Sequence, residues 1–278
     1  MSYQMRVPCA YQGGKQRVAA QIVDHLIEAA PGPNSVFYDL CCGSAAISIE
    51  LVNRGVAPSR ICMLDISSWG AFWSAIGSGT FNMDAFDQLL SGLPSDKRDI
   101  KAHMSELSAH PVGNNEVELY PLLQACSFGG KQIWRDGKRW ANAFFRDYWE
   151  PTATSIRRSP ANPIQPSPGE LRRRIEALTR GMKGVTCLKE DIMTIFSIRL
   201  PRNAVVYVDP PYQDTTGYAF GFDIKLFMAR FRQVSRAPLF ISEGMPLSDD
   251  ALMLKFGGAK GGISGVRTGK HQEWLSRI

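Results

Sequence analysis

Three short apolar segments that each end in an aspartate constrain the fold of this chain more than any other feature. The segments are Ser35-Val-Phe-Tyr-Asp39, Arg60-Ile-Cys-Met-Leu-Asp65 and Ala204-Val-Val-Tyr-Val-Asp209. Apolar runs of this kind are typical of strands that are buried on both faces, as in a parallel sheet covered by helices. A turn at Gly43 and a helical stretch from Ala45 to Asn53 connect the first two segments. This order of strand, turn, helix and strand predicts a βαβ unit.

Both ends of the chain continue the same α/β pattern. Apolar residues at helical spacing predict helices from Gly14 to Ala30 and from Asp223 to Ser235. Further short strands are expected at Val185 to Leu188, at Pro238 to Ser242 and, as an edge strand, at Gln272 to Ile278. We therefore expect an α/β fold with a Rossmann-like, mostly parallel sheet and helices on both of its faces.

The middle of the chain, residues 82–184, interrupts this pattern. It is polar, aromatic and basic, and five prolines fall between Pro151 and Pro168, which is typical of a long loop. We expect a mainly helical lobe inserted into an α/β domain that residues 1–81 and 185–278 form together. A chain of 278 residues is long enough for one large core and a smaller lobe.

The net positive charge of the chain comes from this middle segment. From Lys131 to Lys183 there are 12 basic and 5 acidic residues, a net charge of +7, whereas the remainder has 20 basic and 21 acidic residues. Such a concentrated excess suits a polyanion such as a nucleic acid. A solvated basic face that binds nothing is the alternative.

The sequence also indicates whether to expect disulfides, metal sites or membrane segments. The evidence is the spacing of the cysteines and histidines and the length of the apolar runs. The six cysteines lie mostly in apolar runs without C-x-x-C spacing, so we expect reduced, mostly buried thiols. The four histidines are scattered along the chain, and we expect no metal site. Because there is no apolar run of 18 residues and no signal-peptide pattern at the amino terminus, we expect a soluble, cytoplasmic protein without a membrane partner.

The aspartates that follow the strands are candidate ligand-binding groups. The carboxyl ends of parallel strands meet at one edge of the sheet, where open α/β folds bind ligands. Asp65 follows Asp39 by 26 residues, close to the spacing of about 20 residues at which an acid binds a ribose in nucleotide-binding βαβ units. Gly43 allows close approach of a ligand to the backbone. These residues predict a site for a nucleotide-like ligand, with an ordinary βα turn as the alternative.

The tetrapeptide Asp209-Pro-Pro-Tyr212 is the sharper signal. Its two prolines cannot donate to a sheet ladder, so the strand ends and the carbonyl groups of Asp209 and Pro210 are left free for a ligand. A carboxylate beside a free carbonyl can accept both hydrogens of an exocyclic amino group, and Tyr212 offers a flat face for stacking. The alternative is a turn that ends a strand and contains an incidental aspartate.

The order of these motifs resembles that of the Dam-like, alpha-group (D12 class) DNA adenine-N6 methyltransferases, which use S-adenosylmethionine. Tyr11-Gln-Gly-Gly-Lys15 is similar to their amino-terminal cofactor motif, and Phe37-Tyr-Asp-Leu-Cys-Cys-Gly43 to their glycine motif. Asp209-Pro-Pro-Tyr212 is similar to their catalytic motif. Cys126-Ser-Phe-Gly-Gly-Lys131 and the basic run after it stand where the family has its target-recognition domain. The resemblance covers most of the chain.

The resemblance implies a fold and a set of functional residues. The sheet would be that of a class I methyltransferase, with a target-recognition lobe inserted at residues 82–184. The catalytic residues would be Asp209, Pro210, Pro211 and Tyr212. The cofactor-binding residues would be Tyr11, Gly14, Lys15, Asp39, Cys41, Gly43, Asp65, Ile66, Asp191, Ile192 and Asp209. The DNA-binding residues would be Lys131, Arg135, Lys138, Arg139, Arg172 and Arg173, and none would bind a metal.

Lys15 has an alternative interpretation, and the glycine motif differs from that of the family. Lys15 would lie against the cofactor carboxylate, whereas a lone lysine at a helix start is also typical of a solvated charge. The family has Pro-Phe after the acid of its glycine motif, followed by two or three glycines. Here Leu40-Cys41 follows Asp39, and only Gly43 remains before Ser44-Ala45.

The implied activity is site-specific transfer of a methyl group from S-adenosylmethionine to adenine N6 of a base flipped out of double-stranded DNA. Cytosine N4, an RNA base or a protein glutamine would suit the same pair of acceptors and stays an alternative. A dinucleotide-dependent dehydrogenase is disfavoured because G-x-G-x-x-G is absent. A non-catalytic DNA-binding relative is disfavoured because the run from Asp209 to Tyr212 is intact. The implied setting is a bacterial or phage-infected cell, and the resemblance allows a cognate restriction endonuclease as a partner and either a monomer or a homodimer.

Overall fold

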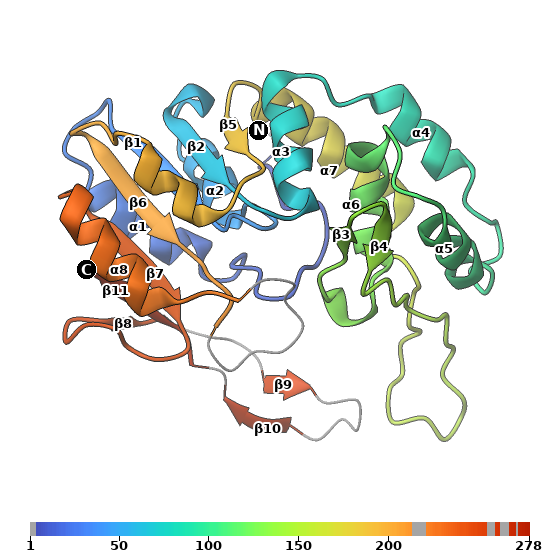
Figure 1. Cartoon of the computed structure of the whole chain (residues 1–278). Coiled ribbons are helices and arrows are strands. Elements are labelled where there is room, and N and C mark those ends of the chain that lie inside the picture. Colours follow the sequence, from blue (N-terminus) through green and yellow to red (C-terminus); the bar gives the residue numbers. More distant parts are fainter. Residues whose placement is uncertain (1–3, 213–220, 255–258, 262–266, 271) are drawn as a thin grey trace.

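A seven-stranded sheet forms the centre of the protein (Figure 1). The computed structural model describes residues 4–212, 221–254, 259–261, 267–270 and 272–278. The strand order is β5-β2-β1-β6-β7-β11-β8. The strands are β1 (Val36–Leu40), β2 (Ile61–Leu64), β5 (Thr186–Leu188), β6 (Ala204–Val208), β7 (Leu239–Glu243), β8 (Leu252–Met253) and β11 (Trp274–Arg277). The first five strands in this order run parallel, and β11 is antiparallel to both of its neighbours. The predicted mixed α/β fold with a mostly parallel sheet is confirmed.

Both faces of the sheet are buried, because successive side chains of a strand point to opposite sides. In β1, Phe37 belongs to the larger hydrophobic core, whereas Tyr38 belongs to a second one. Val205 and Val206 of β6 divide between the two cores in the same way. Buried side chains of α1 (Ala19–Glu28), α2 (Ala46–Asn53) and α3 (Ser68–Ser78) line the larger core, and those of α8 (Ile224–Val234) line the second. Continuous apolar strands thus produce a sheet flanked by helices, as expected.

The carboxy-terminal strand lies one position inside the edge of the sheet. β11 pairs with β7 through Trp274 and Glu243, and with β8 through Leu275 and Leu252. The expectation of an edge strand here was therefore wrong. The edge is β8, which has only 2 residues, too few to produce a periodic pattern in the sequence.

Residues 82–184 form a group of helices and a hairpin beside the sheet (Figure 1). The elements are α4 (Met83–Ser91), α5 (Ile100–Ala109), α6 (Glu116–Cys126), α7 (Pro168–Gly181), β3 (Trp134–Asp136) and β4 (Arg139–Ala141). Leu122 of α6 and Ile175 of α7 belong to the same hydrophobic core as Phe37 of the sheet. A separate core for an inserted lobe is therefore not confirmed, and the proposed domain division stays a prediction.

Short elements complete the described chain. They are the 3₁₀ helices η1 (Pro58–Arg60), η2 (Phe128–Gly130) and η3 (Ile192–Ser197) and the strand pair β9 (Ala259–Gly261) and β10 (Arg267–Lys270). Within the residues that the structure describes, no helix is long and apolar enough to cross a membrane. All six cysteines are free thiols.

Two glycines let α3 approach the ends of two strands closely. A Cβ atom on Gly70 would lie 2.0 Å from the carbonyl oxygen of Asp65, which follows β2. A Cβ atom on Gly77 would lie 2.1 Å from the carbonyl oxygen of Val185, which precedes β5. Since a backbone oxygen cannot move aside as a flexible side chain can, α3 keeps this position only with glycine at both sites. The packing of α3 thereby fixes the loop that carries Asp65.

We expect Gly77→Ala to destabilise the fold by about 1–3 kcal/mol, because the added methyl group overpacks the contact with Val185. Gly169 is the matched control, since it lies in α7 and a methyl group added there would meet no atom within 4 Å. Gly169→Ala should stabilise by roughly 0.4–1 kcal/mol through the entropy of the unfolded chain. Urea unfolding measures both changes. An unchanged stability of Gly77→Ala would contradict the close approach of α3.

Candidate functional site

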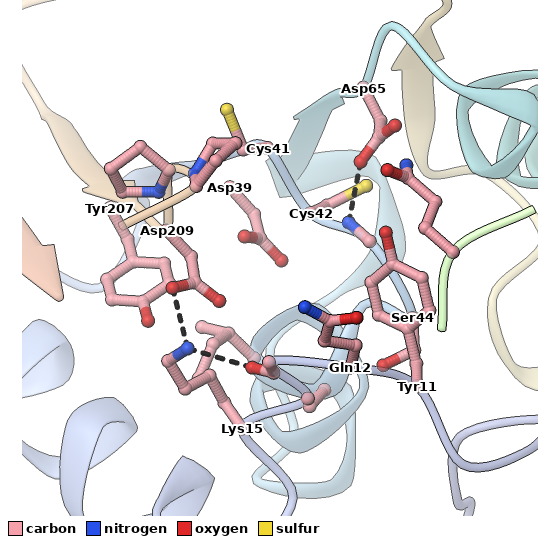
Figure 2. A pocket seen from close by; sticks show the side chains of 18 of the residues that line it. Tyr11, Gln12, Lys15, Asp39, Cys41, Cys42, Ser44, Asp65, Tyr207 and Asp209 are labelled. Atoms are coloured by element: carbon pink, nitrogen blue, oxygen red, sulfur yellow. Dashed lines mark hydrogen bonds and ion pairs between the residues drawn. The ribbon is translucent and has the colours of Figure 1, made fainter. Parts of the chain in front are cut away.

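The strand order reverses between β1 and β6, and a pocket opens at this point. β2 and β5 lie on one side of β1, whereas β6 and β7 lie on its other side. In open α/β sheets, the crevice at such a reversal is where ligands bind, outside the carboxyl ends of the strands. The pocket has a volume of about 760 Å³, including its open mouth. It is lined by Asp39 of β1 and by Asp65 and Asp209, which follow β2 and β6 (Figure 2).

Most of the predicted cofactor and catalytic residues line this single pocket. They are Tyr11, Gly14, Lys15, Asp39, Cys41, Gly43, Asp65, Ile66, Asp209, Pro210, Pro211 and Tyr212. These residues come from four separate parts of the sequence. The structure therefore brings the amino-terminal segment, the glycine turn, the end of β2 and the end of β6 together.

Two predicted cofactor residues do not line the pocket. Asp191 is exposed, and its carboxylate caps η3 by accepting a hydrogen bond of 2.7 Å from the backbone N–H of Met193. Ile192 is buried in the second hydrophobic core. The local fold thus uses Asp191 as a helix cap and Ile192 as a packing residue.

Lys15 is held by three acceptors inside the pocket. Its ammonium lies 2.6 Å from Asp209 Oδ1 (Figure 2). It also lies 3.2 Å from Glu273 Oε1 and donates to the carbonyl of Gly13 at 2.8 Å. The side chain of Lys15 is 4% exposed, so the alternative of a solvated charge is wrong. Lys15 is the partner of Asp209 in this structure. Its expected contact with a cofactor carboxylate stays a prediction.

Asp209 is a carboxylate with a raised pKa. Burial raises the pKa of Asp209 to about 7, although the neighbouring Lys15 ammonium acts to lower it. Among the described residues, Lys15 contacts Oδ1, so Oδ2 would be the oxygen available to a ligand. The next two residues are prolines without N–H groups, which leaves this end of β6 rich in acceptors.

The turn after β1 contains three left-handed residues at alternate positions. Cys41 has φ 60°, Gly43 has φ 50° and Ala45 has φ 55°. A left-handed conformation costs a non-glycine residue of order 1 kcal/mol or more. Ala45 therefore adopts, under strain, a conformation that glycine would adopt freely. Only Gly43 of this turn has the residue type to which a left-handed conformation comes freely.

Asp65 and Asp39 hold this turn in place. Asp65 Oδ2 accepts a hydrogen bond of 2.7 Å from the Gly43 N–H, and Oδ1 accepts from the N–H and the hydroxyl of Ser67. Asp39 accepts from the N–H and the hydroxyl of Ser48 in α2. A carboxylate offers about four acceptor positions, so Asp65 keeps one for a ligand. Burial raises the pKa of Asp39 to about 6.

Sequence reasoning missed two polar residues of the site. Gln132 lines the pocket and is buried, and its Oε1 has no hydrogen-bond partner among the described residues. Glu273 is buried next to Lys15 and Tyr212. Gln132 has no local signal beyond its place after Cys126-Ser-Phe-Gly-Gly-Lys131. Glu273 could have been found only from the pairing of β11 with β7.

The predicted DNA-binding residues divide into exposed and ion-paired groups. Lys131, Lys138 and Arg139 are exposed. Arg172 binds Asp87 of α4 through two hydrogen bonds of 2.8 and 2.9 Å, and Arg173 forms an ion pair with Glu170. Arg172 and Arg173 are thus already engaged on the surface of α7, so they are weaker candidates for phosphate contacts.

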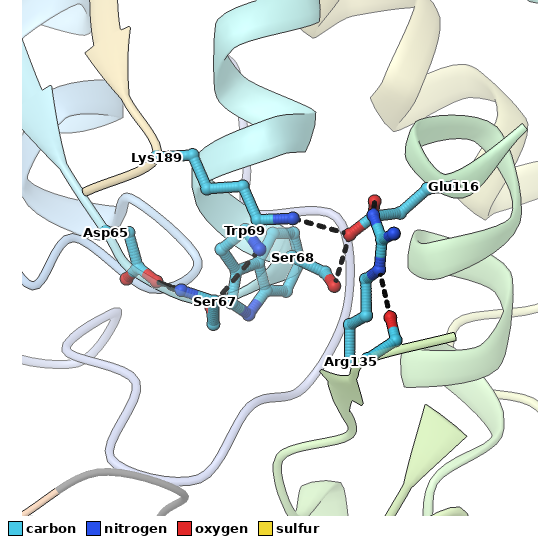
Figure 3. A network of polar contacts seen from close by, with 8 residues as sticks. Asp65, Ser67, Ser68, Trp69, Glu116, Arg135 and Lys189 are labelled. Atoms are coloured by element: carbon cyan, nitrogen blue, oxygen red, sulfur yellow. Dashed lines mark hydrogen bonds and ion pairs between the residues drawn. The ribbon is translucent and has the colours of Figure 1, made fainter. Parts of the chain in front are cut away.

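Arg135 belongs to a cluster around Glu116 (Figure 3). The Glu116 carboxylate accepts from Ser68 of α3 at 2.9 Å, from Lys189 after β5 at 2.8 Å and from Arg135 of β3 at 2.9 Å. Burial opposes the charged form of Glu116, but hydrogen bonds from Lys189 and Ser68 outweigh it, so the pKa of Glu116 is lowered. The cluster joins the hairpin β3–β4 and α6 to the strand ends beside the pocket.

A scan of protein-family models and a search of curated proteins find no match to this chain.

The Glu116 cluster predicts a pH dependence of stability. Because folding lowers the pKa of Glu116 below its ordinary value of 4.5, the charged residue stabilises the fold above that value. This contribution is lost as the pH falls through the lowered pKa. Glu116→Gln should therefore reduce the urea midpoint strongly at about pH 7 and less at about pH 3. Glu106→Gln, on the exposed face of α5, is the control. If Glu116→Gln lowered the urea midpoint equally at both pH values, the charge of Glu116 would not be the stabilising feature.

Proposed function

We propose that the protein is an S-adenosylmethionine-dependent methyltransferase that acts on adenine N6 of a base flipped out of double-stranded DNA. The observation that carries this proposal is the pocket itself. It gathers Lys15, Gly43, Asp65 and the run from Asp209 to Tyr212 in one place, and these residues belong to motifs that resemble those of the Dam-like family. The strand order, with a reversal between β1 and β6, is compatible with the Rossmann-like sheet of a class I methyltransferase.

The pocket offers polar groups that suit the cofactor. The free acceptor position of Asp65 would hold a ribose hydroxyl, and the buried Oε1 of Gln132 would accept a hydrogen from the bound molecule. The left-handed turn around Gly43 lets the ligand approach the backbone closely. When bound, S-adenosylmethionine supplies a methyl group activated by the positive charge on its sulfur.

Residues at the end of β6 would prepare the amino group for attack. Asp209 Oδ2 and the carbonyl of Pro210 would each accept one N6 hydrogen, which keeps the nitrogen lone pair from delocalising into the ring. The same two acceptors stabilise the positive charge that develops on nitrogen. Asp209 has a pKa of about 7, so it can also take up the proton that the methylated nitrogen loses. Tyr212 would stack on the flipped base.

Exposed basic and aromatic side chains near the pocket support a nucleic acid as substrate. Lys138 and Arg139 are exposed on the hairpin β3–β4. Phe128 and Phe144 are 45% and 70% exposed, and a hydrogen bond of 2.7 Å between their backbones holds them side by side. Gly130, two residues after Phe128, accepts a hydrogen bond of 2.8 Å from the N–H of Gln12 in the pocket wall. Cations that contact phosphate, together with exposed rings, are typical of surfaces that bind and distort DNA.

We expect Asp209→Ala to lower the rate of methyl transfer by about 100- to 1000-fold, because it removes an acceptor at the reacting nitrogen. Affinity for S-adenosylmethionine should change little, since Asp65 and the Gly43 turn are untouched. Single-turnover transfer of labelled methyl groups and calorimetric titration of the cofactor measure the two effects. Asp250→Asn, at an exposed acid, is the control. Wild-type turnover by folded Asp209→Ala protein would overturn the mechanism.

The arrangement of basic residues predicts which of them bind DNA. Lys138→Ala/Arg139→Ala should flatten the plot of log affinity against log salt by about one to two units, because both side chains are exposed and can reach phosphates. Arg172→Ala/Arg173→Ala removes the same number of charges from ion pairs on α7 and should change the slope less. Fluorescence anisotropy of a labelled duplex in a salt series compares the two variants. An equal or larger effect of the α7 pair would contradict this division.

A further inference from the structure

Glu273 is a buried acid beside the candidate site. It directly precedes β11, and its side chain is 8% exposed. Its backbone carbonyl accepts a hydrogen bond of 2.9 Å from the N–H of Leu254. The antiparallel pairing of β11 with β7 brings this part of the chain to the carboxyl end of the parallel strands. Burial of a carboxylate is costly unless it is paired and hydrogen-bonded, so its partners indicate why it is there.

Glu273 links the two side chains that surround Asp209. Its Oε1 accepts a hydrogen bond of 3.0 Å from the Tyr212 hydroxyl and lies 3.2 Å from Lys15 Nζ. Lys15 in turn lies 2.6 Å from Asp209 Oδ1 and 5.0 Å from the centre of the Tyr212 ring. Asp209, Lys15, Glu273 and Tyr212 thus form one connected set, in which Glu273 contacts both Lys15 and Tyr212.

We propose that Glu273 is a positioning residue that aligns Asp209, through Lys15, and the ring of Tyr212 for methyl transfer. This inference rests on the proposed function. Glu273 does not line the pocket, and it acts by fixing the ammonium between two carboxylates and by anchoring the tyrosine hydroxyl. Without Glu273, only Asp209 and the Gly13 carbonyl would hold the Lys15 ammonium, whereas Glu273 adds a third contact from a separate part of the sheet.

The charge of Glu273 has a second effect on the site. Two ionised carboxylates around one ammonium leave a net charge of −1, which favours the positive charge that develops on the amino nitrogen. With a neutral residue at position 273, Lys15 and Asp209 would cancel each other.

The groups around Asp209 determine how this effect depends on pH. They are Lys15 on the amino-terminal segment, Asp39 on β1, Tyr207 on β6, Tyr212 after β6 and Glu273 before β11. Burial raises the pKa of Asp209, Lys15 acts to lower it, and Glu273 and Asp39 act to raise it further. Removal of the Glu273 charge should therefore lower the pKa of Asp209.

The test compares Glu273→Gln with Glu118→Gln. A glutamine at position 273 can still accept from the Tyr212 hydroxyl but carries no charge. Glu118 is an equally buried glutamate that accepts from the N–H of Asn82 at the start of α4, away from the pocket. For Glu273→Gln we expect kcat to fall about tenfold, less than for a group that touches the reacting atom. The acidic limb of its pH profile should move to lower pH by about one unit. Glu118→Gln should change stability only.

A second readout does not depend on turnover. Labelling of lysines with an amine-reactive reagent, read for each residue by mass spectrometry, should show Lys15 protected in the wild type relative to the exposed Lys138. In Glu273→Gln, Lys15 should react faster, whereas Glu118→Gln should leave its protection unchanged. If the wild type transfers no methyl group, the proposed function fails and labelling still tests the contact. A wild-type pH profile together with unchanged Lys15 protection in Glu273→Gln would overturn the inference.

Discussion

A buried ammonium shared between two carboxylates holds the candidate site together. Removing an ammonium and two carboxylates from water is expensive, and the arrangement persists only because every N–H of Lys15 has an acceptor. Through this one residue the amino-terminal segment is tied to the end of β6 and to the segment before β11. Lys15 itself lines the pocket, so the contact joins its amino-terminal wall to the end of β6. The left-handed turn after β1 and Tyr212 line the same pocket.

The residues that surround the pocket also tie it to the middle of the chain. Glu116 of α6 joins Arg135 of the hairpin to Lys189 after β5, and Gln132 lines the pocket itself. The helices of this segment share the larger hydrophobic core with the sheet. A segment connected by core packing and by an ionic cluster around a buried glutamate does not move independently of the pocket at low cost. In the proposed function, this rigidity would hold the DNA-contacting hairpin in a fixed position relative to Asp209.

The sequence predicts the architecture well where one strand or helix carries its own signal. The apolar runs ending at Asp39, Asp65 and Asp209 correspond to neighbouring strands, and their aspartates line one pocket because parallel strands end at a common edge. Features that depend on packing between distant segments were missed or misjudged. Glu273 reaches the site only through an antiparallel strand, and the partners of Arg172 lie on another helix. Ala45 adopts a backbone conformation that its residue type does not suggest.

If this pocket directs a methyl group to adenine N6, the methylated nucleoside identifies the reaction directly. The protein would be incubated with S-adenosylmethionine carrying a tritiated methyl group and with double-stranded DNA, and the DNA would then be digested to nucleosides and separated. RNA and a glutamine-containing protein would be incubated in parallel. We expect tritium in N6-methyldeoxyadenosine. Absence of label from DNA, or label confined to N4-methyldeoxycytidine, RNA or protein, would contradict it.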